Sequence, residues 1–209
     1  MSDKAKINVA KKAIEYIPEG CILGVGSGTT VNFFIKELSK KNKHIKAAIA
    51  SSSVTEDLLK KYNIPVISLN EVDLLELYID GTDAIDKNNF CIKGGGGALT
   101  QEKIIATMAK KWICIADKSK YTKNIAQHSI AVEVIPSARS FVARKLVQLK
   151  FIPIFRENFI TDNHNIILDI KATTGKIDLT NFENTLNQIP GVVENGIFIK
   201  RTPDTALFD

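Results

Sequence analysis

The chain has 209 residues, of which 44% are hydrophobic and 24% charged, and its formal net charge is +5. A chain of this length can bury enough surface to fold without disulfide or metal crosslinks, and its composition excludes disorder, collagen-like repeats and coiled coils. The small positive charge alone does not indicate a class of partner.

The apolar periodicity of the first part of the chain predicts strands that alternate with helices, as in a parallel sheet covered on both faces. The expected helices lie at residues 7–17, 33–38, 54–62 and 99–110. The expected strands lie at residues 21–25, 45–50, 66–68, 77–80, 90–93 and 112–116, with a turn-rich stretch at 81–89 and a loop at 94–97.

The pattern changes after about residue 127. It then predicts, in order, a strand at 130–134, a helix at 138–149, strands at 153–156 and 166–170, a helix at 180–188 and a strand at 192–199. This βαββαβ order is typical of the ferredoxin-like arrangement. We therefore expect an α/β protein with a Rossmann-like, mostly parallel sheet domain at 1–127 plus 199–209. A smaller α+β (ferredoxin-like) domain is expected at 128–198.

The cysteines and the termini bear on the cellular compartment. Cys21, Cys91 and Cys114 are isolated from one another, which suits a reducing environment better than a disulfide framework. The first residues lack a signal-peptide pattern, and no apolar run approaches the roughly 20 residues of a membrane span. We expect a cytoplasmic protein with no membrane or nucleic-acid partner. The three histidines are scattered, so no zinc site is predicted.

The first glycine cluster, Gly-Val-Gly-Ser-Gly-Thr-Thr at residues 24–30, lies between an expected strand and an expected helix. Amide groups and the helix dipole at such a junction favour an anion. A dinucleotide fingerprint would need glycine at Thr29 and an acid where residues 51–53 are serines, and a P-loop would need a lysine. Two interpretations stay open here: a small phosphate bound by Ser27, Thr29 and Thr30, or a tight turn with threonine as N-cap.

Two carboxylates, Asp80 and Asp83, follow an apolar strand directly, at the sheet edge where ligands bind in open parallel sheets. Asp86 raises the question of a metal site, but no calcium-binding motif surrounds it. A turn residue is the favoured interpretation of Asp86, and no metal is predicted.

The second glycine cluster follows Lys93 and precedes a helix that carries Glu102 in its first turn. Four consecutive glycines, at residues 94–97, are costly in conformational entropy, but they allow backbone amides to face a ligand. The helix dipole would favour an ionised Glu102, as a carboxylate base requires. A lysine together with carboxylates suggests proton transfer next to a carbonyl, with the cation stabilising an enediolate. The plainer interpretations are a capping acid for Glu102 and a solvated lysine for Lys93.

Taken together, these motifs resemble the type A ribose-5-phosphate isomerase family. The resemblance extends over essentially the whole chain, in order. It rests on residues 24–30, 51–53, 70–73, 78–83, 93–96, 102–106, 115–120, 132–136, 161–163 and 189–193.

The resemblance implies reversible isomerisation of D-ribose 5-phosphate and D-ribulose 5-phosphate through an enediolate, without a metal or organic cofactor. It implies that Glu102 is the base, that Asp80 helps to open the sugar ring with Asp83 assisting, and that Lys93 stabilises the enediolate. The substrate and phosphate ligands that it implies are Ser27, Gly28, Thr29, Thr30, Gly81, Thr82, Gly94, Gly95, Gly96 and Lys120. The family also implies a homodimer, in some members a tetramer.

The chain departs from the family pattern at three places. Residues 27–30 read Ser-Gly-Thr-Thr where Thr-Gly-Ser-Thr is common, Ala84 replaces an acid, and Gln101 replaces a frequent arginine. Two other classes of protein fit the sequence less well than an isomerase. A non-catalytic sugar-phosphate sensor would have no need of Lys93, Asp80 and Glu102 together, and a nucleotide-dependent oxidoreductase is disfavoured by Thr29.

Overall fold

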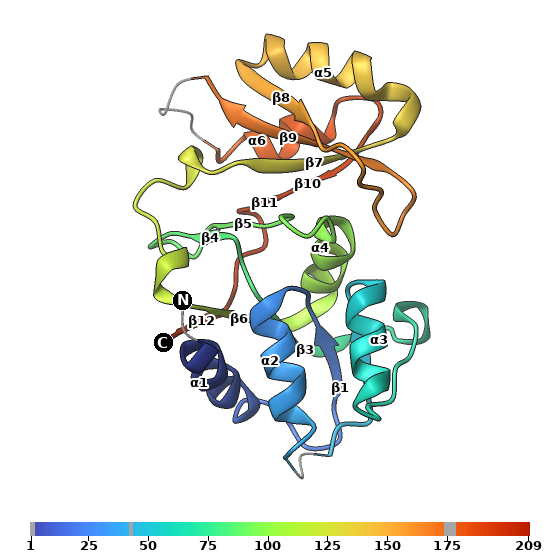
Figure 1. Cartoon of the computed structure of the whole chain (residues 1–209), viewed down its shortest axis with the longest axis vertical. Coiled ribbons are helices and arrows are strands. Elements are labelled where there is room, and N and C mark those ends of the chain that lie inside the picture. Colours follow the sequence, from blue (N-terminus) through green and yellow to red (C-terminus); the bar gives the residue numbers. More distant parts are fainter. Residues whose placement is uncertain (1–2, 42–43, 174–178) are drawn as a thin grey trace. The chain divides into compact units, whose positions relative to one another are not determined.

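Apolar segments that alternate with helices form a parallel sheet in the computed structural model, which describes residues 3–41, 44–173 and 179–209 (Figure 1). Its five strands are β1 (Ile22–Val25), β2 (Ala47–Ala50), β3 (Leu75–Asp80), β6 (Ala109–Ala116) and β12 (Thr205–Phe208). They are arranged in the order β12-β6-β3-β1-β2, and every neighbouring pair is parallel. This sheet belongs to the first of two compact units, which the described residues within Met1–Thr82, Gln101–Lys120 and Pro203–Asp209 form.

Helices cover both faces of this sheet, as the alternation of strands and helices predicts. Helices α1 (Asp3–Ile14) and α2 (Thr29–Leu38) lie side by side on one face (Figure 1). Their apolar residues pack against strand residues that point to that face, such as Leu23 and Ile79. On the other face, Ile105 of α4 (Leu99–Met108) lies over Gly24. Helix α3 (Ser53–Lys61) packs beside β2.

The second unit, formed by the described residues within Asp83–Thr100 and Tyr121–Thr202, contains two antiparallel sheets. The larger sheet has the order β10-β7-β9-β8. Its elements are β7 (Ile130–Val134), α5 (Arg139–Gln148), β8 (Phe151–Phe155), β9 (Ile166–Ala172), α6 (Phe182–Asn187) and β10 (Val192–Asn195). The smaller sheet, β11-β5-β4, consists of β4 (Ala84–Ile85), β5 (Cys91–Ile92) and β11 (Ile197–Phe198). The predicted fold class, a parallel-sheet domain and a smaller ferredoxin-like α+β domain, is confirmed.

Several predicted elements differ from those observed. Residues 66–68 form only an isolated bridge from Val66 to Ala48, because the chain turns there into the 3₁₀ helix Leu69–Glu71. The expected turn at 81–89 contains the short strand β4, and the expected strand at 192–199 is split into β10 and β11 at Gly196. Strand β12 was not predicted, since its residues are all half-buried and lack an alternating pattern. Further 3₁₀ helices lie at Lys118–Lys120, Ile125–Gln127 and Pro136–Ala138.

The two units are interleaved along the chain. Residues 83–100 belong to the second unit, whereas the sequence-based boundaries, 1–127 plus 199–209 and 128–198, assign them to the first. Those boundaries stay a proposal about the functional domains. Within the described ranges, no helix has both the length and the apolar character that a membrane crossing requires.

Candidate active site

The first group of predicted site residues lies at the carboxyl edge of the parallel sheet. Strands β1, β3 and β6 are neighbours, so the residues that follow them meet at one edge. Ser27 follows β1, Asp80 ends β3, and Lys120 lies in the 3₁₀ helix after β6. Ligands of open parallel sheets bind at this edge.

Asp80 is completely buried, and backbone and side-chain donors hold both of its carboxylate oxygens. Its Oδ1 accepts hydrogen bonds from the amides of Ser27, at 3.0 Å, and Gly81, at 2.6 Å. Its Oδ2 accepts a hydrogen bond from the Tyr78 hydroxyl at 2.5 Å. A buried carboxylate needs such partners to offset the loss of its hydration, and here they also fix its orientation.

Gly26 leaves the space that this carboxylate fills. A Cβ atom at position 26 would lie 1.8 Å from Oδ1 of Asp80 and 2.0 Å from its Cγ. The backbone of Gly26 is itself held on both sides, because its amide donates to the Ile79 carbonyl and its own carbonyl accepts from the Thr55 hydroxyl. The glycine is therefore required by the close approach of Asp80 and the loop.

Glu102 joins the same cluster through Ser27. The Ser27 hydroxyl donates to Oε1 of Glu102 at 2.6 Å, while the amide of the same residue donates to Asp80. Glu102 is only 3% exposed and lies in the first turn of α4, where the helix dipole favours a negative charge. One serine thus links the two carboxylates that the sequence singled out, and Glu102 is more than a solvent-exposed capping acid.

Tyr78 is a member of this cluster that the sequence analysis missed. Burial is the main cause that raises the pKa of its hydroxyl well above the usual value of 10.0, and the nearby charges of Asp80 and Glu102 raise it further. Tyr78 therefore keeps its proton and acts as a fixed donor to Asp80. A signal was present in the sequence, since residues two apart on a strand face the same side and Tyr78 precedes Asp80 by two.

The predicted phosphate loop begins helix α2. Its N-cap is Gly28, with φ 97°, which has no side chain that could cap the first turn. The alternative interpretation of a threonine N-cap is therefore wrong. The Thr29 hydroxyl accepts a hydrogen bond at 3.0 Å from Nζ of Lys6, which also lies 5.9 Å from the ring centroid of Phe33. A lysine of α1 thus brings positive charge to the loop, where the helix dipole already favours an anion.

A second group of predicted residues belongs to the second unit. Asp83 accepts a hydrogen bond from the Gly95 amide at 2.7 Å. Lys93 is only 4% exposed, its amide donates to the Gly196 carbonyl, and its Nζ lies 5.9 Å from the ring centroid of Phe198. The interpretation of Lys93 as a solvated surface lysine is therefore wrong.

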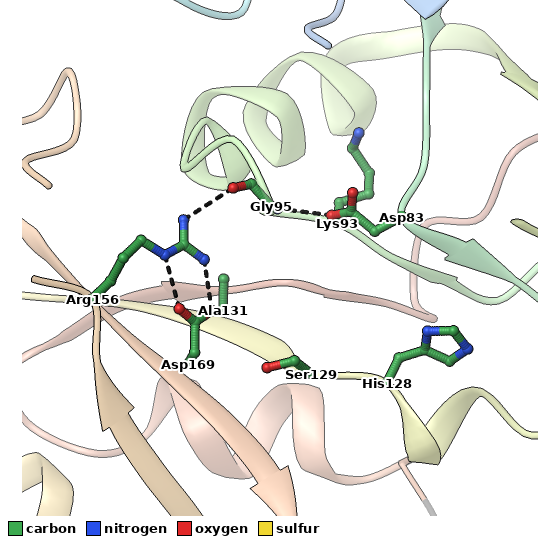
Figure 2. Close-up of a pocket in the computed structure, with 8 residues that line it drawn as sticks. All are labelled: Asp83, Lys93, Gly95, His128, Ser129, Ala131, Arg156 and Asp169. Carbon is green, nitrogen blue, oxygen red and sulfur yellow. Dashed lines mark hydrogen bonds and ion pairs between the residues drawn. The ribbon is translucent and has the colours of Figure 1, made fainter. Parts of the chain in front are cut away.

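Arg156 supports the glycine loop, residues 94–97, and no role for this arginine was predicted from the sequence. Its guanidinium makes two hydrogen bonds to Asp169, at 2.8 and 2.6 Å, and its Nη1 donates to the Gly95 carbonyl at 3.2 Å (Figure 2). The same Nη1 donates to the Gly94 carbonyl at 3.2 Å. These hydrogen bonds restrain the backbone of the loop at Gly94 and Gly95. A pocket of about 210 Å³ lies here, and the residues that line it are Asp83, Lys93, Gly95, His128, Ser129, Ala131, Arg156 and Asp169.

The structure also describes the other positions that the sequence singled out. Asp86 accepts hydrogen bonds from the amides of Asn88 and Phe90, so the interpretation as a turn residue is confirmed. Ala84 is fully buried and pairs with Ile92, which leaves no solvated position for the acid common in the family. The amide of Gly81 binds Asp80, whereas Thr82 and Lys120 are half-buried.

Comparisons with known proteins agree over most of the chain. The family model described as Ribose 5-phosphate isomerase A (phosphoriboisomerase A) matches residues 47–209. A protein named Ribose-5-phosphate isomerase A from Legionella pneumophila (strain Lens) is 53% identical over 202 residues, which cover 97% of this chain and 93% of that protein.

Two solved structures have the same fold over the whole chain. The crystal structure of ribose 5 phosphate isomerase A from Neisseria gonorrhoeae is 41% identical with a TM-score of 0.95, covering 100% of this chain and 93% of that one. A D-ribose-5-phosphate isomerase in complex with phospho-erythronic acid is 34% identical with a TM-score of 0.94, covering 100% of this chain and 95% of that one.

The contact between Gly26 and Asp80 predicts a large effect of one methyl group. Gly26→Ala should lower the free energy of unfolding by about 1–3 kcal/mol, because the added Cβ must displace the Asp80 carboxylate. Urea unfolding followed by circular dichroism measures the change. The matched control is Gly81→Ala in the same unit, whose Cβ would meet its nearest atom at 3.7 Å and should cost far less. Equal stability of the two variants would contradict the proposed overlap.

Proposed function

Since the chain belongs to the ribose 5-phosphate isomerase A family, we propose that it interconverts D-ribose 5-phosphate and D-ribulose 5-phosphate. The reaction moves a proton between C1 and C2 of the open-chain sugar, through an enediolate. It is an internal redistribution of hydrogen, so it needs no external oxidant or reductant. As the resemblance implies, we propose that it also uses no organic cofactor or metal. The arrangement of Ser27, Asp80 and Glu102 is the observation that carries this proposal.

Glu102 is the proposed base. It takes the proton from C2 of the aldose and returns it to C1 of the ketose, so it ends the reaction in the state in which it began. A carboxylate suits this role when it is held near the carbon acid, shielded from water and kept ionised. The 2.6 Å hydrogen bond from Ser27, the burial of Glu102 and its place in the first turn of α4 all support the assignment.

Asp80 is proposed to open the furanose ring and to carry protons between the sugar hydroxyls. Its two oxygens are fixed by the Ser27 and Gly81 amides and by the Tyr78 hydroxyl, so it needs little reorganisation when substrate binds. Tyr78 is assigned the role of a positioning residue, because it acts through Asp80. Asp83 assists, as the resemblance implies.

Lys93 is proposed to stabilise the negative charge that develops on the enediolate oxygens. Its cation is worth most where water is scarce, and the burial of this lysine supports such a role. Gly94, Gly95 and Gly96 present backbone groups to the substrate, and the bonds from Arg156 and Asp83 to this loop support a preformed conformation.

The phosphate is proposed to bind at Ser27, Gly28, Thr29 and Thr30, with Gly81, Thr82 and Lys120 as further substrate contacts. The glycine N-cap of α2 and the lysine that binds Thr29 support an anion there. A family member solved with phospho-erythronic acid, a phosphorylated sugar acid, supports the same class of ligand for this chain. We also propose that the protein acts in the cytoplasm, as its isolated cysteines suggest.

A second prediction concerns the proposed base. Glu102→Gln keeps the shape of the side chain but cannot accept the proton, so kcat should fall about 100-fold or more. Ribulose 5-phosphate formation from ribose 5-phosphate, measured with EDTA present, gives the rate. Glu76→Gln is the matched control, because Glu76 lies exposed on β3, and it should retain nearly full activity. An inactive wild type, or a need for metal, would overturn the proposed reaction.

The hydrogen bond from Lys6 to Thr29 predicts a contribution to phosphate affinity. Lys6→Gln should raise KM about tenfold and change kcat little, since a hydrogen bond from a charged group is worth roughly 1.5 kcal/mol. Steady-state kinetics at low and moderate salt measure this change. Lys4→Gln removes the same charge from an exposed position of the same helix and serves as control. The same rise in KM for both variants would mean that only the overall charge matters.

The homodimer is a separate proposal, which rests on the resemblance to the family. Sedimentation equilibrium of the full chain should give twice the mass of one chain at micromolar concentration. A single-chain mass would remove the proposal, and four times that mass would indicate the tetramer found in some members.

A further inference from the structure

A buried carboxylate in the second unit lies outside the proposed reaction. Glu133 is on β7, an inner strand of the β10-β7-β9-β8 sheet, and it is completely buried. Its Oε1 accepts hydrogen bonds from the Thr161 hydroxyl at 2.8 Å and from the side-chain amides of Asn163 and Asn165 at 3.1 and 2.9 Å. Its Oε2 accepts a hydrogen bond from the hydroxyl of Thr100.

Burying such a polar cluster in a core costs free energy. A buried acid must lose its hydration, and a well-packed apolar side chain of similar volume is often equally stabilising. Unlike an apolar contact, each hydrogen bond of the polar cluster is directional and therefore fixes the position of its partner residue. The partners come from two segments: the turn at 161–165, which joins β8 to β9, and the start of helix α4.

The link to α4 leads directly to the proposed base. Thr100 lies in the first turn of α4, two residues before Glu102 on the same helix. The residue before it, Leu99, is also held, because it packs in a small apolar cluster with Ala131 of β7 and Ile167 of β9. The first turn of α4 is therefore attached to β7 by one apolar contact and one directional hydrogen bond.

We infer that Glu133 is a positioning residue for the isomerisation, a role that rests on the proposed function. Through Thr100 it fixes the first turn of α4, and the helix transmits that position to the Glu102 carboxylate. The Ser27–Glu102 hydrogen bond, at 2.6 Å, leaves little tolerance for a shift of the helix. A displacement of about 1 Å at a reacting group can cost on the order of 100-fold in rate.

The test removes the link and leaves the rest of the cluster intact. Thr100→Val deletes the hydroxyl at constant shape, and kcat should fall about 10- to 100-fold while KM stays within about twofold. Thr100→Ser keeps the hydroxyl and should restore most of kcat. The matched control is Thr161→Val, which takes a hydroxyl from Oε1 of the same Glu133 but is not part of α4. It should lower the melting temperature comparably and leave kcat within about threefold.

Each outcome decides the inference. A Thr100→Val enzyme with kcat within twofold of wild type would overturn it, and so would an equal loss of kcat in Thr161→Val, which indicates general destabilisation. If Thr100→Ser fails to restore kcat, the hydroxyl is not the link. An inactive wild type would instead defeat the proposed function. In that case, crystal structures of wild type and Thr100→Val still test the role of Glu133 independently of activity. The inference requires the first turn of α4 to shift in the variant, and an unshifted turn would overturn it.

Discussion

One close contact organises the candidate site: the Asp80 carboxylate lies in the space that the missing side chain of Gly26 leaves, 1.8 Å from where a Cβ would be. From that position Asp80 receives the amide of Ser27 and so orients that residue. Ser27 in turn directs its hydroxyl to Glu102, on a helix far along the chain. The geometry of both carboxylates thus depends on a backbone that passes too close for any side chain.

A common physical device recurs in both units, namely an ionic group, buried or partly buried, whose partners are fixed before any ligand arrives. Asp80 has two amides and the Tyr78 hydroxyl, whose raised pKa keeps it a donor. Arg156 joins Asp169 to the glycine loop, and Glu133 joins a turn to the start of α4. Dipoles set in advance need not reorganise during a reaction, which is the main source of electrostatic catalysis. Burying these groups costs stability that the apolar cores of both units must offset.

The fold class and the positions of most candidate site residues follow from local patterns in the sequence, because strand ends and glycine-rich loops are encoded in adjacent residues. The roles of those residues came from the resemblance and stay proposals. Alternating strands and helices and the βαββαβ order were predicted and confirmed. What local patterns miss depends on partners distant in sequence. Strand β12 exists because residues 205–208 pair with β6, and Arg156 acquires its role by reaching a loop some 60 positions earlier. The period of two along a strand could have predicted that Tyr78 lies on the same side as Asp80, but this prediction was not made.

The path of the chain has a consequence for its biosynthesis. The first unit contains both α1 and β12, and Asn8 and Lys12 of α1 bind Asp209 after the last strand. During synthesis on the ribosome, α1 therefore lacks some of its partners until Asp209 has been added. Until then the edge of β6 lacks its neighbour, and an uncovered strand edge invites pairing with other chains. Loss of residues 205–209 would remove the strand beside β6 and the partner of Asn8 and Lys12, which lie about 200 residues earlier in the chain.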